Sequence, residues 1–137
     1  MCAAYCGASV GTIPTSFGVL SALAYLYVNY NSLSGADVWS SISPATTDLD
    51  ITHNLFSGPV PFNSEKYNFT NFYIRSNSFT GTLPADMSIF SQVVILDLSF
   101  NLFSGTLGTQ LKAVSTGTSV TSPPFLLCIM LFWRLDL

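Results

Sequence analysis

Asp48 and Asp50 are the two residues in this sequence whose types and spacing come nearest to a catalytic pair. Two residues apart on an extended strand, their side chains would point to the same side, roughly 6.6 Å apart along the strand. Paired carboxylates at such a separation can act on a glycosidic bond. That chemistry needs a pocket that holds the pKa values of the two carboxyl groups apart, and an open strand offers none. We therefore predict surface acidity or weak cation binding here, no catalytic residues, and a protein that is not an enzyme.

His53 and the three cysteines are the other side chains that could bind a metal ion. His53 is the only histidine, stands directly before Asn54 and has no second histidine or cysteine at ligand spacing, so we expect a solvated turn residue. Cys2, Cys6 and Cys128 form neither a paired framework nor a metal-ligand cluster. Their odd number leaves the redox compartment open. We predict no metal site and no cofactor.

Charge is scarce throughout the chain. Only 8% of the 137 residues are charged and 49% are apolar, against about 25% charged in ordinary soluble domains. The cations are Lys66, Arg75, Lys112 and Arg134, which form no basic stripe to neutralise phosphates, so we expect no nucleic-acid partner. A polar surface made of Ser, Thr and Asn suits an extracellular or cell-surface protein that carries glycans, and Asn68 begins the one glycosylation sequon. Residues 1–11 lack the basic and apolar regions of a signal peptide.

A sequence repeat determines the strands and turns that must position these side chains. Its marks are Asn31, Asn54, Asn77 and Asn101, spaced by 23, 23 and 24 residues. Apolar residues recur at fixed distances before them, with Thr46 as an exception, and the alternation in Leu96-Asp97-Leu98 predicts one short parallel strand per unit with its apolar residues inward. Each asparagine comes where the chain turns away from the strand, and its amide can bond backbone groups that the turn leaves unpaired. We predict that the four asparagines form a structural asparagine ladder.

The repeat divides the chain into four parts. Residues 1–18 form a degenerate N-terminal repeat, and residues 19–111 hold four units. The register fails after Gly108, and residues 112–124, rich in Ser, Thr and Pro, are typical of a linker. In the tail, residues 125–137, the apolar run 125–133 is too short for a transmembrane helix, which needs roughly 20 residues. We expect this run to cap the open end of the repeats or to mark a truncated product. Membrane association is expected only through a larger parent protein or weakly through this run.

The repeat closely resembles the plant-type leucine-rich repeat, L-x-x-L-x-x-L-x-L-x-x-N-x-L-[ST]-G-x-[IL]-P. The first full unit matches it at Leu20, Leu23, Leu26, Val28, Asn31, Leu33, Ser34 and Gly35. The pattern is familiar from plant receptor-like proteins and kinase ectodomains, polygalacturonase-inhibiting proteins and kinetoplastid surface antigens. The resemblance implies a leucine-rich-repeat solenoid, or horseshoe fragment, with short parallel strands on the concave side and 3₁₀ turns, extra strands or irregular loops on the convex side. It also implies a recognition module outside the cell. Phenylalanine replaces the leucine after the asparagine in three units, and cysteine-bearing end caps are missing.

The strand residues that face outward form columns across neighbouring units, and we predict that they bind a protein or glycan. The predicted binding residues are Tyr25, Tyr27, Asp48, Asp50, Asn71, Tyr73, Arg75 and Asp97. Tyrosine offers a large contact area and a hydroxyl group at a small cost in conformational entropy. A third outward column is Asn29, Thr52, Arg75 and Ser99. The alternatives are solvated strand residues in a structural or adhesive surface repeat without a discrete ligand site, and a truncated fragment of a larger receptor.

Overall fold

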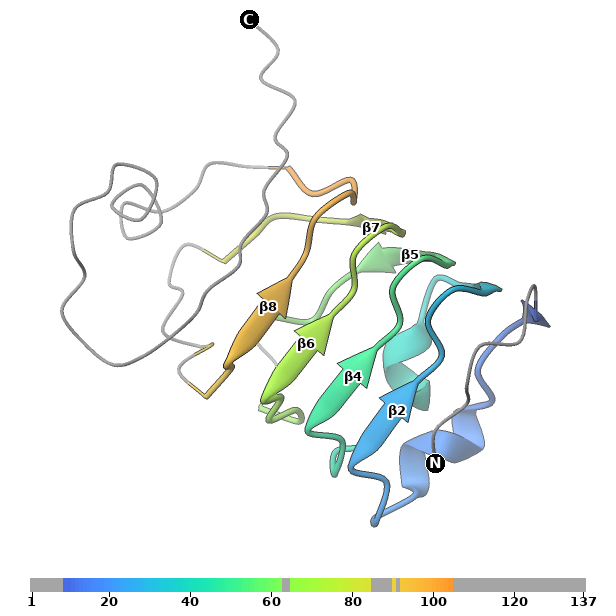
Figure 1. Cartoon of the computed structure of the whole chain (residues 1–137), viewed down its shortest axis with the longest axis vertical. Coiled ribbons are helices and arrows are strands. Elements are labelled where there is room, and N and C mark those ends of the chain that lie inside the picture. The colour runs from blue at the N-terminus through green and yellow to red at the C-terminus, as the bar shows by residue number, and fades with distance from the viewer. Residues whose placement is uncertain (1–8, 63–64, 85–89, 91, 105–137) are drawn as a thin grey trace, which may run out of the picture.

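Two parallel β-sheets run along the chain in the computed structural model, which describes residues 9–62, 65–84, 90 and 92–104. The first sheet consists of β2 (Tyr25–Tyr27), β4 (Asp48–Asp50), β6 (Asn71–Tyr73) and β8 (Ile95–Asp97). The second consists of β1 (Val10–Gly11), β3 (Ser32–Gly35), β5 (Leu55–Pro59) and β7 (Ser78–Thr80). Two 3₁₀ helices, η1 (Thr15–Val19) and η2 (Val38–Ser41), lie in the connections. Figure 1 shows the strands of the first sheet side by side in chain order.

Each unit of the repeat contributes one strand to the first sheet, as predicted. The middle residues of the four strands pair in register and are buried: Leu26, Leu49, Phe72 and Leu96. Their neighbours on either side point the other way because side chains alternate along a strand. One unit alone could not cover this apolar row, whereas stacking covers it from both sides. The structure therefore confirms the predicted solenoid of short parallel strands.

The asparagines bind the backbone at the turn after each strand. The side-chain nitrogen of Asn54 donates to the carbonyl oxygens of Val28 (3.0 Å), Ile51 (3.2 Å) and Thr52 (3.1 Å), and its oxygen accepts from the Leu33 backbone N–H at 3.0 Å. Asn31, Asn77 and Asn101 also bond backbone groups at their turns. Because the Asn54 amide reaches both its own turn and that of the preceding unit, each rung of the asparagine ladder ties two units together.

A left-handed backbone conformation precedes every rung of the ladder. Tyr30, His53, Ser76 and Phe100 have φ values of 54°, 51°, 52° and 53°. Non-glycine residues rarely adopt this conformation, so each turn carries some strain. The hydrogen bonds of the following asparagine hold the turn in place against it.

Aromatic side chains fill the space between the two sheets. Phe56 and Phe79 are fully buried and stack with their ring centroids 6.4 Å apart. Trp39, in η2, lies 5.5 Å from Phe79 and donates from its indole nitrogen to the Pro59 carbonyl oxygen at 3.0 Å. The phenylalanines that replace leucine in the repeat therefore enlarge the core.

Buried hydroxyl groups connect neighbouring units on the side of the 3₁₀ helices. Thr46, the polar exception in the apolar pattern, is fully buried and donates to the Leu23 carbonyl oxygen at 2.9 Å. Ser43 donates in the same way to Leu20 at 2.8 Å. Within the described part of the chain, no buried side-chain nitrogen or oxygen lacks a hydrogen-bond partner. The hydroxyl group thus makes Thr46 compatible with the core.

Several sequence predictions concern residues outside the described ranges. They include the three cysteines, the linker at 112–124 and the tail at 125–137. The boundaries of the N-terminal repeat and of the four units stay predictions. Within the described residues, no helix has the length and apolar character needed to cross a membrane.

Candidate functional site

Seven of the eight predicted binding residues lie on β2, β4, β6 and β8, and Arg75 follows β6. Tyr25 pairs with Asp48, which pairs with Asn71; Tyr27, Asp50, Tyr73 and Asp97 form the next column. The structure brings all of these side chains to the side of the first sheet that faces away from the core. We call this surface, defined by the eight predicted residues, the open face.

Neighbouring polar groups fix the carboxylates of the open face in place. Asp48 accepts a hydrogen bond from the Thr47 hydroxyl at 2.8 Å and another from the Asn71 side-chain amide. Asp50 accepts from the backbone N–H of Thr52 at 3.0 Å and from its hydroxyl at 2.7 Å. Both carboxylates are half-buried. The two aspartates are therefore oriented by their surroundings before any ligand arrives.

Thr52 and Ser99 occupy the predicted outward positions, but they are not exposed to solvent as expected. Both are buried, at 8% and 3% exposure. The cause is local: Asp50 accepts both the N–H and the hydroxyl of Thr52, and Asp97 does the same for Ser99. Each aspartate folds over the residue two positions later and covers it. The third column thus presents only Asn29 and Arg75, which are half-buried.

Arg75 places a positive charge at the C-terminal end of the open face. A guanidinium nitrogen lies 3.9 Å from a carboxylate oxygen of Asp97, and the guanidinium carbon lies 4.4 Å from the centre of the Phe100 ring. Both contacts help to hold the guanidinium group in place. Arg75 lies beside Asp97, and no described cation lies within salt-bridge distance of Asp48 or Asp50. Within the described part of the chain, the unbalanced negative charge of the open face therefore lies at these two aspartates.

Tyr73 lies among these carboxylates, and their negative charges affect the pKa of its hydroxyl group. Burial raises the pKa of its hydroxyl above the ordinary value of 10.0, and the charges of Asp50, Asp48 and Asp97 raise it further. A raised pKa in the folded state means that Tyr73 stabilises the fold fully below pH 10 and loses this contribution as pH rises through the raised pKa. We expect Tyr73→Phe to lessen the loss of stability at alkaline pH. Thermal melts of both proteins from pH 8 to 12 measure this, and parallel curves would contradict it.

His53 occupies the turn before its ladder asparagine. It is half-buried, and its ring stacks on that of Tyr30 with centroids 4.3 Å apart and an interplanar angle of 10°. The residue is therefore less solvated than predicted. Among the described residues, no three His, Cys, Asp or Glu side chains lie close enough together to hold a metal ion.

Proteins of known family share this repeat sequence. No family model matches the chain. Receptor-like protein 39 of Arabidopsis thaliana is 31% identical over 121 residues, which are 85% of this chain and 14% of that protein. Receptor-like protein 7 of the same plant is 33% identical over 99 residues, which are 71% and 10% of the two chains. The chain thus spans a small part of the relatives it matches.

The solved structures that this chain resembles include those of plant receptors. The plant peptide hormone receptor RGFR1, in complex with RGF2, superposes with a TM-score of 0.62 at 31% identity, covering 74% of this chain and 17% of that one. The ectodomain of the Arabidopsis thaliana receptor kinase SOBIR1 superposes with a TM-score of 0.61 at 28% identity, covering 80% and 59%. The chain is a plant-type leucine-rich-repeat solenoid. Its open face is the concave sheet of that solenoid.

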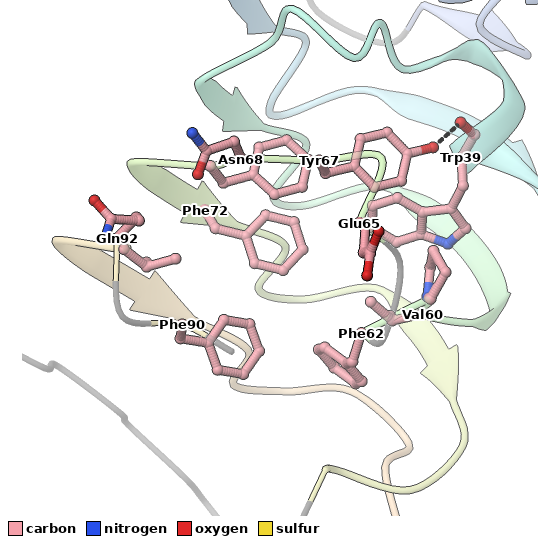
Figure 2. Close-up of a pocket in the computed structure, with 12 residues that line it drawn as sticks. Trp39, Val60, Phe62, Glu65, Tyr67, Asn68, Phe72, Phe90 and Gln92 are labelled. Carbon is pink, nitrogen blue, oxygen red and sulfur yellow. Dashed lines mark hydrogen bonds between the residues drawn. The ribbon is translucent and has the colours of Figure 1, made fainter. Parts of the chain in front are cut away.

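A second concavity of the solenoid was missed in the sequence. It is a cleft of about 400 Å³ among the connecting segments, which we call the aromatic cleft. Its lining is Trp39, Val60, Pro61, Phe62, Glu65, Tyr67, Asn68, Phe69, Phe72, Phe90, Gln92 and Val93. Figure 2 shows aromatic rings from several segments around it. Phe69, Phe72, Phe90 and Val93 stand at the recurring apolar positions of the repeat, which predict a buried row and give no sign of a cleft.

Proposed function

We propose that the open face of this leucine-rich-repeat solenoid binds a peptide segment of a partner protein outside the cell. The observation that carries the proposal is the column register, which places tyrosine, aspartate, asparagine and arginine side chains on one sheet face. RGFR1, similar in fold and 31% identical, was solved with RGF2 and is described as a peptide hormone receptor. This likeness supports a peptide ligand over a sugar polymer.

The charges of the open face indicate what such a peptide carries. Asp48 and Asp50 are unbalanced, so a lysine, an arginine or an amino terminus of the ligand is expected above β4. An acidic or amide group is expected nearer Arg75, at the other end of the face. Exposed Tyr25 and half-buried Tyr27, with ring centroids 6.4 Å apart, offer apolar contact area at the N-terminal end. We therefore expect a ligand with a basic group above β4 and an acidic or amide group near Arg75.

A displayed peptide library tests this proposal. Peptides selected on the wild-type solenoid should be enriched in Lys and Arg. The triple variant Tyr27→Ala, Asp50→Asn, Tyr73→Ala should bind them about 100-fold more weakly, since a few contact residues supply most of the binding energy at such surfaces. Asparagine at position 50 keeps an oxygen acceptor for Thr52 and so protects the local fold.

The control is a matched change on the other sheet. Leu55→Ala removes an exposed side chain, 60% accessible, from β5, and should leave peptide binding unchanged. Circular dichroism should be the same for wild type and both variants. Equal binding by the triple variant would exclude the open face as the binding site and favour a structural or adhesive repeat.

A further inference from the structure

Asn68 stands at the edge of the aromatic cleft, and the cleft has no role in the proposed peptide binding. The residue is exposed and begins the sequon Asn68-Phe69-Thr70. Its side-chain amide makes no hydrogen bond to another described residue. Figure 2 shows Asn68 on the same side of the cleft as Gln92, with the rings of Phe72 and Phe90 between them and Phe62. A group attached to Asn68 therefore starts at the rim of an aromatic concavity.

The walls of the cleft are built from stacked rings. Phe69 stacks on Tyr67 at 5.4 Å and on Phe72 at 4.6 Å, with interplanar angles of 9° and 8°. Phe90 meets Phe62 edge to face at 5.7 Å. The Tyr67 hydroxyl donates to the Trp39 carbonyl oxygen, which fixes this wall to η2. These ring contacts and this hydrogen bond hold the walls of the cleft together.

The chemistry of the cleft matches a sugar better than a purely apolar group. A pyranose ring has an apolar C–H face that packs on aromatic rings, and hydroxyl and amide groups around its edge that need polar partners. Glu65 and Gln92 line the cleft and are exposed, so they offer a carboxylate and an amide to such an edge. A cleft of about 400 Å³ lies within the range of small-molecule sites.

We propose that Asn68 carries an N-linked glycan and that its first N-acetylglucosamine lies in the aromatic cleft. The inference rests on the extracellular placement in the proposed function, because the glycan is added in the secretory pathway. In that step the Asn68 side-chain nitrogen bonds to C1 of the sugar, the bond from C1 to a lipid diphosphate carrier breaks, and the amide proton is lost to base. In the folded chain, the Thr70 backbone N–H donates to the Thr47 carbonyl oxygen at 2.7 Å, and the Thr70 carbonyl oxygen accepts from the Val94 N–H at 2.7 Å.

Enzymatic trimming separates the first sugar from the rest of the glycan. The full chain is secreted from cells restricted to high-mannose glycans, and one portion is trimmed to a single N-acetylglucosamine with endoglycosidase H. Another portion is stripped completely with peptide N-glycosidase F, which leaves aspartate at position 68. The trimmed protein should keep the melting temperature of the untrimmed one. The stripped protein should melt lower, on the order of 4 °C, and Asn68→Asp made without a glycan should match it.

Two further variants separate cleft binding from a general effect of glycosylation. Leu55→Asn in an Asn68→Gln background creates the acceptor Asn-Phe-Ser on exposed β5, away from the cleft, and stripping its glycan should leave the melting temperature unchanged. The rim variant Glu65→Ala, Gln92→Ala should melt like wild type when stripped and should lose at least half of the stabilisation by the first sugar.

The contrary results are equally definite. The inference would be overturned by a secreted protein without a glycan mass at Asn68. It would also be overturned by equal melting temperatures of the trimmed and stripped proteins, or by an unaltered glycan effect in the rim variant. None of these results bears on the peptide library selected on the open face. Conversely, a glycan seated in the cleft of a protein that binds no peptide would leave this inference standing and remove the proposed function.

Discussion

Asn54→Ala is expected to lower the free energy of unfolding by about 2–4 kcal/mol. Asn54 is buried, at 6% exposure, and makes three donor bonds and one acceptor bond to backbone groups of two units. Alanine leaves the Leu33 N–H without its acceptor and removes a donor from three carbonyl oxygens. The bonds to Ile51 and Thr52 are buried, so water can replace only part of the lost hydrogen bonding. Urea denaturation followed by circular dichroism measures the change.

Two other variants show whether the hydrogen bonds cause this effect. Asn54→Asp keeps an acceptor for Leu33 but places a carboxylate against three carbonyl oxygens, so it should destabilise at least as much as alanine. Asn29→Ala removes an asparagine whose side chain makes no hydrogen bond to another described residue, and should change the free energy of unfolding by less than about 0.5 kcal/mol. If Asn54→Ala behaves like Asn29→Ala, the asparagine at position 54 does not hold the turn.

The register of the open face could be predicted from the sequence because two local patterns determine it. Alternation of apolar and polar residues decides which strand residues face the core, and the spacing of the asparagines decides which residues of neighbouring strands are opposite. These two patterns place Tyr27, Asp50, Tyr73 and Asp97 in one column, and the structure has the same column. The type of fold and the arrangement of the predicted binding residues therefore follow from the chain alone.

The errors arise where side-chain contacts override the repeat. Thr52 and Ser99 occupy outward positions but are covered by Asp50 and Asp97. The sequence Asp-x-Thr or Asp-x-Ser was a usable local signal for this contact. The aromatic cleft had no such signal, because Trp39 of one unit meets Tyr67 of another. Contacts between irregular connecting segments depend on how the units pack, which repeat spacing does not describe.

Phe79→Ala is expected to cost about 3–5 kcal/mol of folding stability. Phe79 is fully buried between the sheets, 6.4 Å from the Phe56 ring and 5.5 Å from the Trp39 ring. Removing its ring leaves a cavity beside the Phe56 and Trp39 rings, which the surrounding side chains can fill only in part. Chemical denaturation measures the loss of stability, and intrinsic tryptophan fluorescence should change because Trp39 loses a ring contact.

Two variants serve as controls for Phe79→Ala. One places a smaller apolar residue at position 79, and the other shortens an exposed side chain elsewhere. Phe79→Leu, which restores the residue usual in this repeat, should cost markedly less than alanine because it leaves a smaller cavity. Leu55→Ala, on exposed β5, should change stability by less than about 0.5 kcal/mol. If leucine at position 79 is as destabilising as alanine, ring stacking with Phe56 and Trp39 rather than filled volume holds the two sheets together. The aromatic residues would then be a requirement of this core instead of a tolerated enlargement.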